Sequence, residues 1–144
     1  SIIKIVEHLI KNKVQVMGHL GVLPQSVKGK FKFKGKKKIE RKKIFNDAKL
    51  LESKGIFSLV LECVETSLAK QITKSLKIPT IGIGSSVYCD GQVLVTDDLL
   101  GLNEAKIKFV KKFGNIKKYI KIAAQKFKSE VVNKKYPTKK YSYN

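Results

Sequence analysis

The fold class of this chain is decided by the stretch Ser58-Leu59-Val60-Leu61-Glu62-Cys63-Val64. It is an unbroken apolar run with one acid near its end, a pattern typical of a parallel strand covered on both faces. Gly55 precedes the run, and Glu65-Thr66-Ser67, a typical helix start, follows it. Glu62 is therefore expected at the carboxyl end of a buried strand, where α/β sheets place their chemistry.

A carboxylate in that position is unfavourable unless it is paired, bound to a metal or used in a reaction. From position alone, two interpretations of Glu62 stay open: a structural acid paired with a lysine or backbone amides, and a catalytic acid. His19 also has two interpretations, a loop histidine held by a backbone hydrogen bond or a substrate contact. For Cys63, inert packing is the favoured interpretation.

Length and composition predict one globular domain over residues 1–144, with residues 133–144 as a tail. The hydrophobic content is 42%, and no apolar run approaches the ~20 residues of a membrane span. Cys63 and Cys89 are too few for a disulfide framework or a zinc site, so a reducing, cytoplasmic location is expected. The chain starts with Ser1 rather than Met, which suggests a fragment or a processed chain.

The formal net charge of +20 raises the question of nucleic-acid binding. Thirty of the 31 basic residues are lysines, and only Arg41 is an arginine. Surfaces that recognise phosphates favour the two-pronged arginine side chain, so a solvated lysine surface without specific nucleic-acid binding is the favoured interpretation. Phe31 and Phe33 alternate with lysines and could stack bases, but a loop that covers one end of a barrel is favoured.

Apolar periodicity predicts alternating helices and strands. The helices are expected over residues 2–11, about 40–54, about 66–76 and about 116–132. The strands are expected over residues 14–17, 58–64, 79–84 and 92–95. Gly18-His19-Leu20-Gly21 is interpreted as a flexible turn, and residues 28–43 as either an edge strand or an extended loop.

This alternation predicts βαβ units and a parallel sheet. Because such units cross over with one hand, the carboxyl ends of all the strands lie on one rim. His19, Glu62 and the turn Gly84-Ser85-Ser86 are therefore expected to converge there. No base-orienting partner can be named for the two serines, so turn chemistry is favoured over a nucleophile.

Four motifs, in order, resemble the ketopantoate hydroxymethyltransferase family. The first is Gly18-His19-Leu20-Gly21 followed by Pro24-Gln25-Ser26, and the second is Leu59-Val60-Leu61-Glu62-Cys63-Val64. The others are Ile78-Pro79-Thr80-Ile81-Gly82-Ile83-Gly84 and Asp90-Gly91-Gln92-Val93-Leu94-Val95. Each motif is weak alone, but their shared order and spacing make the resemblance specific. It extends from the first residue nearly to the last.

The resemblance implies a (β/α)8 TIM barrel of the phosphoenolpyruvate/pyruvate superfamily that acts as a magnesium-dependent homo-oligomer. The implied reaction transfers a hydroxymethyl group from 5,10-methylenetetrahydrofolate to 3-methyl-2-oxobutanoate, giving 2-dehydropantoate for pantothenate and coenzyme A synthesis. Glu62 matches the family's proton acceptor, and His19 matches a histidine of the active-site region. We expect Ser85 to add a hydroxyl near the pocket. The expected partners are small-molecule substrates, with no membrane and no specific nucleic acid.

The resemblance also implies that this chain covers only part of such a barrel, which needs ~250 residues. Its strands correspond to roughly the last four of eight. The Mg²⁺ ligands, and a lysine that meets the keto acid, are expected before this part, so no metal ligand is assigned here. The chain alone is expected to be inactive. The alternative is a non-catalytic basic protein that binds nucleic acid or another polyanion on a remnant of the fold.

Several positions depart from the family pattern. Val22-Leu23-Pro24 stands where a threonine commonly precedes the proline, Gly84-Ser85-Ser86 where Gly-Ala-Gly is usual, and Asp97-Asp98 where His-Asp is frequent. A carboxylate held against an apolar wall is suited to accept a carbon-bound proton. The residues Leu59, Leu61 and Val64 are expected to help form such a wall beside Glu62.

Overall fold

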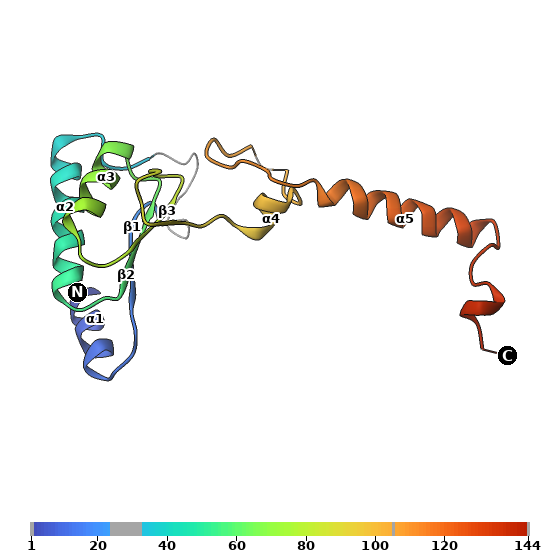
Figure 1. The fold of residues 1–144 in the computed structure, drawn as a ribbon, viewed down its shortest axis with the longest axis horizontal. Helices are drawn as coiled ribbons and strands as arrows, with labels where there is room; N and C mark the ends of the chain where they lie inside the picture. Colours follow the sequence, from blue (N-terminus) through green and yellow to red (C-terminus); the bar gives the residue numbers. More distant parts are fainter. Residues whose placement is uncertain (1, 24–32, 105, 144) are drawn as a thin grey trace. The chain divides into compact units, whose positions relative to one another are not determined.

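A computed structural model describes residues 2–23, 33–104 and 106–143 of the chain (Figure 1). These residues divide into two compact units, Ser1–Val93 and Leu94–Asn144. Residues 1–144 were expected to fold as one domain. The division into two units does not test folding, so the single domain stays a prediction. The predicted loop over Pro24-Gln25-Ser26 lies outside the described residues, as does Phe31.

The first unit is built on a four-stranded parallel sheet, as the alternation of helices and strands predicted. Its strands are β1 (Met17–Gly21), β2 (Ser58–Glu62), β3 (Thr80–Ile83) and β4 (Gly91–Gln92). They lie side by side in chain order, and each pairs in parallel with the next. Because every strand runs in the same direction, their carboxyl ends share one rim of the sheet.

Three helices lie on one side of this sheet (Figure 1). They are α1 (Ile2–Lys11), α2 (Lys38–Ser53) and α3 (Thr66–Ser75). Their apolar faces and the sheet form the core of the first unit, whose buried members are Val6, Ile44, Ala48, Leu51, Ile56, Leu59, Leu61, Val64, Leu68, Ala69, Ile72 and Cys89. The helix expected over about residues 40–54 is confirmed as α2, and its buried residues are Ile44, Ala48 and Leu51.

Side chains along β2 alternate between the two faces of the sheet. Leu59 and Leu61 are fully buried in the core with the helices. The intervening positions, Ser58, Val60 and Glu62, therefore belong to the opposite face. The register places Gly21, Glu62 and Ile83 in one row across three strands, and His19, Val60 and Ile81 two residues earlier, in the next row on the same face.

The prediction for the first strand was wrong. Val14–Met17 was expected to be the strand and Gly18–Gly21 a flexible turn, whereas β1 covers Met17–Gly21 and pairs with β2 along its whole length. Gly18 is suited to this strand because a Cβ there would lie 2.7 Å from Ile56 Cδ1. This glycine lets the strand approach the core closely rather than bending the chain.

The fourth strand is shorter than predicted. The expected strand covered residues 92–95, but β4 contains only Gly91 and Gln92. Val93 still donates its N–H to the Gly82 carbonyl at 3.0 Å. Residues 28–43 were expected to be an edge strand or an extended loop. Within this segment, Lys34 makes an isolated parallel bridge with Val64, and the residues from Lys38 onward belong to α2.

The second unit contains α4 (Thr96–Leu100), α5 (Ile116–Val132) and the short 3₁₀ helix η2 (Lys139–Tyr141). The bounds predicted for α5 are confirmed, while α4 and η2 were not predicted. The structure describes α5 throughout, and none of its residues is buried. Within the described parts of the chain, every helix is too short or too polar to span a membrane.

Candidate functional site

Glu62 and His19 lie together at the rim of the sheet. Glu62 is the last residue of β2 and pairs with Gly21 of β1, so His19 lies one row away on the same face. His19 Nε2 is 3.2 Å from Glu62 Oε2. The Glu62 side chain is 10% exposed and that of His19 is 35% exposed. The pair is thus a largely buried carboxylate next to an imidazole that solvent or a ligand can reach.

The neighbouring strands fix the backbone of Glu62. Val22 donates its N–H to the Glu62 carbonyl at 2.9 Å, and Cys63 donates its N–H to the Ile83 carbonyl at the same distance. The strand ladder therefore continues on both sides up to the end of β2. A carboxylate placed on a rigid strand end is held more precisely than one carried by a loop.

Gly21 allows β1 to approach this point closely. Its φ is +107°, and a Cβ there would lie 2.1 Å from the Glu62 carbonyl oxygen and 2.8 Å from Val64 Cγ2. Any larger residue would have to displace the backbone of Glu62. The glycine that suggested a flexible turn is thus required by the site itself.

The apolar surroundings of Glu62 differ from those expected. Leu59 and Leu61 lie on the opposite face of the sheet and pack in the core, so they do not form a wall beside the carboxylate. Ile83 is paired with Glu62 and shares its face, and Val60 precedes it on that face. Strict alternation along the strand, which a continuous apolar run conceals, explains the difference.

Cys63 directly follows Glu62 and has a left-handed backbone, with φ +49°. Such a conformation in a non-glycine residue costs about 1–3 kcal/mol and persists only where the surroundings impose it. Burial, and then the charge of Glu62, raise the pKa of the Cys63 thiol. A neutral buried thiol is a poor nucleophile, which supports the interpretation of Cys63 as inert packing.

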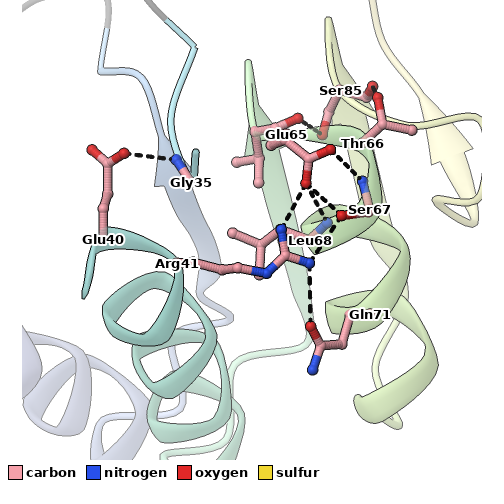
Figure 2. A network of polar contacts seen from close by, with 10 residues as sticks. Gly35, Glu40, Arg41, Glu65, Thr66, Ser67, Leu68, Gln71 and Ser85 are labelled. Atoms are coloured by element: carbon pink, nitrogen blue, oxygen red, sulfur yellow. Dashed lines mark hydrogen bonds and ion pairs between the residues drawn. The ribbon is translucent and has the colours of Figure 1, made fainter. Parts of the chain in front are cut away.

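The turn of residues 63–65 connects Glu62 to α3 and is held from both sides. Lys34 donates its N–H to the Cys63 carbonyl, and Glu65 donates its N–H to the Lys34 carbonyl, each at 2.8 Å. Ser85 Oγ donates to the Val64 carbonyl at 3.0 Å (Figure 2). The Ser85 hydroxyl thus lies beside the turn, where its oxygen can still accept a hydrogen bond.

A polar network around Arg41 and Glu65 was not predicted (Figure 2). Arg41 Nη1 donates to Glu65 Oε2 at 2.7 Å, and Arg41 Nη2 donates to Ser67 Oγ at 2.9 Å. Glu65 is the N-cap of α3 and accepts the N–H groups of Ser67 and Leu68 at 3.0 Å. Hydrogen bonds from Ser67, and then from Arg41, lower the pKa of Glu65 from 4.5 to about 2.

The described residues do not contain a group of three His, Cys, Asp or Glu side chains placed to hold a metal ion. At the rim, Glu62 and His19 offer two such groups. Ser85 belongs to the same rim, but the contact of its hydroxyl is with the Val64 carbonyl. The roles expected for Glu62, His19 and Ser85 stay predictions.

Comparison with known proteins shows which family the chain is similar to. The model of the family described as ketopantoate hydroxymethyltransferase matches residues 1–139. A 3-methyl-2-oxobutanoate hydroxymethyltransferase of Pelagibacter ubique is 66% identical over 143 residues, covering 99% of this chain and 55% of the relative. The proteins of that name from Bdellovibrio bacteriovorus and Clostridium botulinum (strain 657 / Type Ba4) are 49% and 46% identical.

The alignments to the latter two relatives cover 99% and 96% of this chain, and 55% and 51% of the relatives. The chain therefore spans about half the length of the curated relatives it matches. The residues that these alignments cover include β1, β2 and the rim between them.

Proposed function

This chain belongs to the ketopantoate hydroxymethyltransferase family, and from that premise we propose that it supplies the proton acceptor of a 3-methyl-2-oxobutanoate hydroxymethyltransferase. The proposed reaction transfers a hydroxymethyl group from 5,10-methylenetetrahydrofolate to the keto acid and forms 2-dehydropantoate. The observation that carries the proposal is the buried carboxylate of Glu62 at the strand end, 3.2 Å from His19.

Glu62 acts as the general base in this proposal. Its carboxylate accepts the proton from C3 of the keto acid, and the electrons of the broken C–H bond move into the enolate. The nucleophilic C3 then forms the new carbon–carbon bond to the one-carbon unit. Both bonds from that unit to the folate nitrogens break, each nitrogen takes up a proton so that tetrahydrofolate leaves, and water supplies the hydroxyl group of the product. A positioned base of this kind contributes ~10²–10⁴-fold to the rate of proton transfer.

His19 orients this base and borders the pocket. Its Nε2 faces one oxygen of the carboxylate, Oε2, and this leaves Oε1 for the substrate proton. The exposed part of the imidazole ring is available to the keto acid. We keep Ser85 as a pocket residue in this proposal. Its hydroxyl contacts the turn of residues 63–65, and Glu62 directly precedes that turn.

The family resemblance also implies Mg²⁺, and we carry this over as part of the proposal. The residues described at the rim do not form a metal site, so we assign no ligand among them. When bound, the ion would polarise the ketone of the substrate. The role of this chain's own residues is the removal and holding of the proton at Glu62.

The proposed architecture of the complete enzyme is a (β/α)8 barrel of the phosphoenolpyruvate/pyruvate superfamily. Four parallel strands in chain order, with helices on one side, support a barrel, because doubly wound sheets carry helices on both faces and reverse the strand order. The row of His19, Val60 and Ile81 would then face the barrel interior. Assembly as a homo-oligomer in the cytoplasm belongs to the same proposal.

The test measures exchange of the C3 deuteron of 3-methyl-2-oxobutanoate into water, which isolates proton removal from the folate chemistry. It uses the full-length protein that carries this chain, and a chimera in which the chain replaces the matched segment of the Pelagibacter ubique relative. Glu62→Gln should lower the exchange rate by ~10²–10⁴-fold, with a much smaller change in keto-acid affinity. Glu7→Gln makes the same chemical change at an exposed helix position and serves as the control.

Two results would refute the proposal. The first is that neither the full-length protein nor the chimera, each without substitutions, exchanges the C3 deuteron or transfers the hydroxymethyl group under conditions where the Pelagibacter ubique relative is active. The second is exchange by Glu62→Gln at the parent rate, which would leave the family assignment in place but remove Glu62 as the base.

A further inference from the structure

The three-residue turn after Glu62 is short, and its first residue is strained. Cys63 has a left-handed backbone, and Glu65, two residues later, already caps α3. A turn of this kind has little freedom to absorb movement, so a shift of Glu65 is passed to Glu62. Whatever fixes Glu65 therefore also fixes the end of β2.

Two adjacent residues at the start of α2, Glu40 and Arg41, hold the segment of residues 63–65 in place (Figure 2). Glu40 Oε2 accepts the N–H of Gly35 at 2.8 Å, and this anchors the residue after Lys34. Arg41 contacts the Glu65 carboxylate directly. We call Glu40 and Arg41 the α2 clamp, because one holds the strand-like segment that bonds to Cys63 and the other holds the helix cap.

Gly35, which Glu40 holds, packs closely against α3. Its φ is +88°, and a Cβ there would lie 2.5 Å from Leu68 Cδ2. The segment that bridges to the turn is thus packed directly on the first turn of α3. The two halves of the clamp act on one packed unit rather than on separate loops.

We propose that Arg41 is a positioning residue for Glu62, and that the α2 clamp holds the turn of residues 63–65 in the conformation that directs the carboxylate toward His19. The inference rests on the proposed function of Glu62 as proton acceptor. Arg41 is suited to this role because its planar group donates to Glu65 and Ser67 through two separate nitrogens in a fixed geometry, which the single nitrogen of a lysine does not provide.

The size of the expected effect follows from the remaining contacts. A displacement of 1 Å at a reacting group can lower a rate ~10²-fold. Without Arg41, the bonds from Val22, Lys34 and Ser85 to the backbone of residues 62–64 remain. We therefore expect Arg41→Gln to lower the rate of C3 deuteron exchange about tenfold, through kcat, with KM changed less than about twofold.

The experiment compares Arg41→Gln, Arg41→Lys and the double variant Arg41→Gln/Glu65→Gln in the full-length protein that carries this chain. Lys43→Gln is the matched control, because Lys43 lies on the same helix and pairs with Asp47 away from the turn. Rates are expressed per folded protein at a temperature where each variant is fully folded. Arg41→Lys should react faster than Arg41→Gln. The rate of the double variant should be at least about half that of Arg41→Gln, because the two side chains act through one contact.

A second readout does not depend on activity. Amide hydrogen exchange at Lys34 and Glu65, whose N–H groups close the turn, should accelerate at least about tenfold in Arg41→Gln and stay unchanged in Lys43→Gln. If the parent protein fails to exchange the C3 deuteron, the proposed function of Glu62 fails, while amide exchange still tests whether Arg41 holds the turn. The clamp inference is overturned if amide protection is unaltered in Arg41→Gln. It is also overturned if Arg41→Gln reacts within about twofold of the parent, or if Lys43→Gln loses as much rate.

Discussion

His19 Nε2 lies 3.2 Å from Glu62 Oε2, and the two side chains come from neighbouring parallel strands. The contact is diagonal, since the residue paired with Glu62 is Gly21 rather than His19. A residue larger than glycine at position 21 would collide with the Glu62 carbonyl. The spacing of His19 and Gly21 therefore serves two needs, an imidazole beside the carboxylate and a close approach of the two strand ends.

The first prediction concerns the contribution of His19. His19→Ala removes the group that faces Oε2 and should lower the rate of C3 deuteron exchange about tenfold or more, because a polar contact to a charged group is lost. His19→Gln keeps a side-chain donor and should stay within about threefold of the parent. Both rates are measured in the full-length protein that carries this chain. Equal losses in the two variants would contradict an orienting contact to the carboxylate.

The second prediction compares two glycines with positive φ. Gly55 has φ +92°, and a Cβ there would make only ordinary van der Waals contact, with Ile10 Cγ2 at 3.7 Å, whereas Gly21→Ala places that atom 2.1 Å from the Glu62 carbonyl oxygen. Gly55→Ala should therefore lose about 1–2 kcal/mol of unfolding free energy, the cost of backbone strain alone. Gly21→Ala should lose at least about 2 kcal/mol more, in addition to proton-transfer activity. Urea titration gives both free energies, and similar losses would contradict the proposed close approach.

Much of the first unit could be predicted from short-range patterns. The apolar run with one terminal acid predicted β2 and the position of Glu62 at its end. The i, i+4 spacing of apolar residues predicted the bounds of α5, although none of the residues of this helix is buried. Periodicity reports which residues share a face, but not what covers that face.

The misassigned elements depend on contacts distant in the sequence. Gly18 and Gly21 suggested a turn, but parallel pairing with Ser58–Glu62 makes them part of a strand. Arg41 and Glu65 are 24 residues apart, and no local pattern joins them. The available signal was that Arg41 is the only arginine in a lysine-rich chain, which indicates a position where lysine does not suffice.

The third prediction concerns nucleic acid. The single arginine is engaged by Glu65 and Ser67, so a polyanion would meet lysines. Binding of labelled duplex or single strands should fall at least about tenfold between 50 and 200 mM salt, and it should not depend on base sequence. Fluorescence titration at several salt concentrations measures both properties. Tight, sequence-selective binding at physiological salt would instead favour a basic binding protein on the same fold.

The last prediction concerns the acid sensitivity that Glu65 gives to the fold. Its pKa is lowered from 4.5 to about 2, first by the Ser67 hydrogen bonds and then by Arg41. A lowered folded-state pKa means that the ionised group stabilises the fold above pH 4.5, and that this contribution disappears as the pH falls toward 2. Because the side chain is 29% exposed, we expect roughly 2 kcal/mol rather than the full value of the shift.

Glu65→Gln should accordingly lower the unfolding free energy by roughly 2 kcal/mol at pH 7 and by much less at pH 2, where the pH has reached the folded-state pKa of about 2 and the native carboxyl is about half protonated. Glu130→Gln on α5 is the control, because the Glu130 carboxylate is 40% exposed and lies 4.0 Å from Lys126, and it should show little difference at either pH. Urea unfolding of the full-length protein that carries this chain, repeated between pH 7 and pH 2, measures the difference. A loss in Glu65→Gln that stays constant over this range would mean that Glu65 stabilises the turn through its shape rather than its charge.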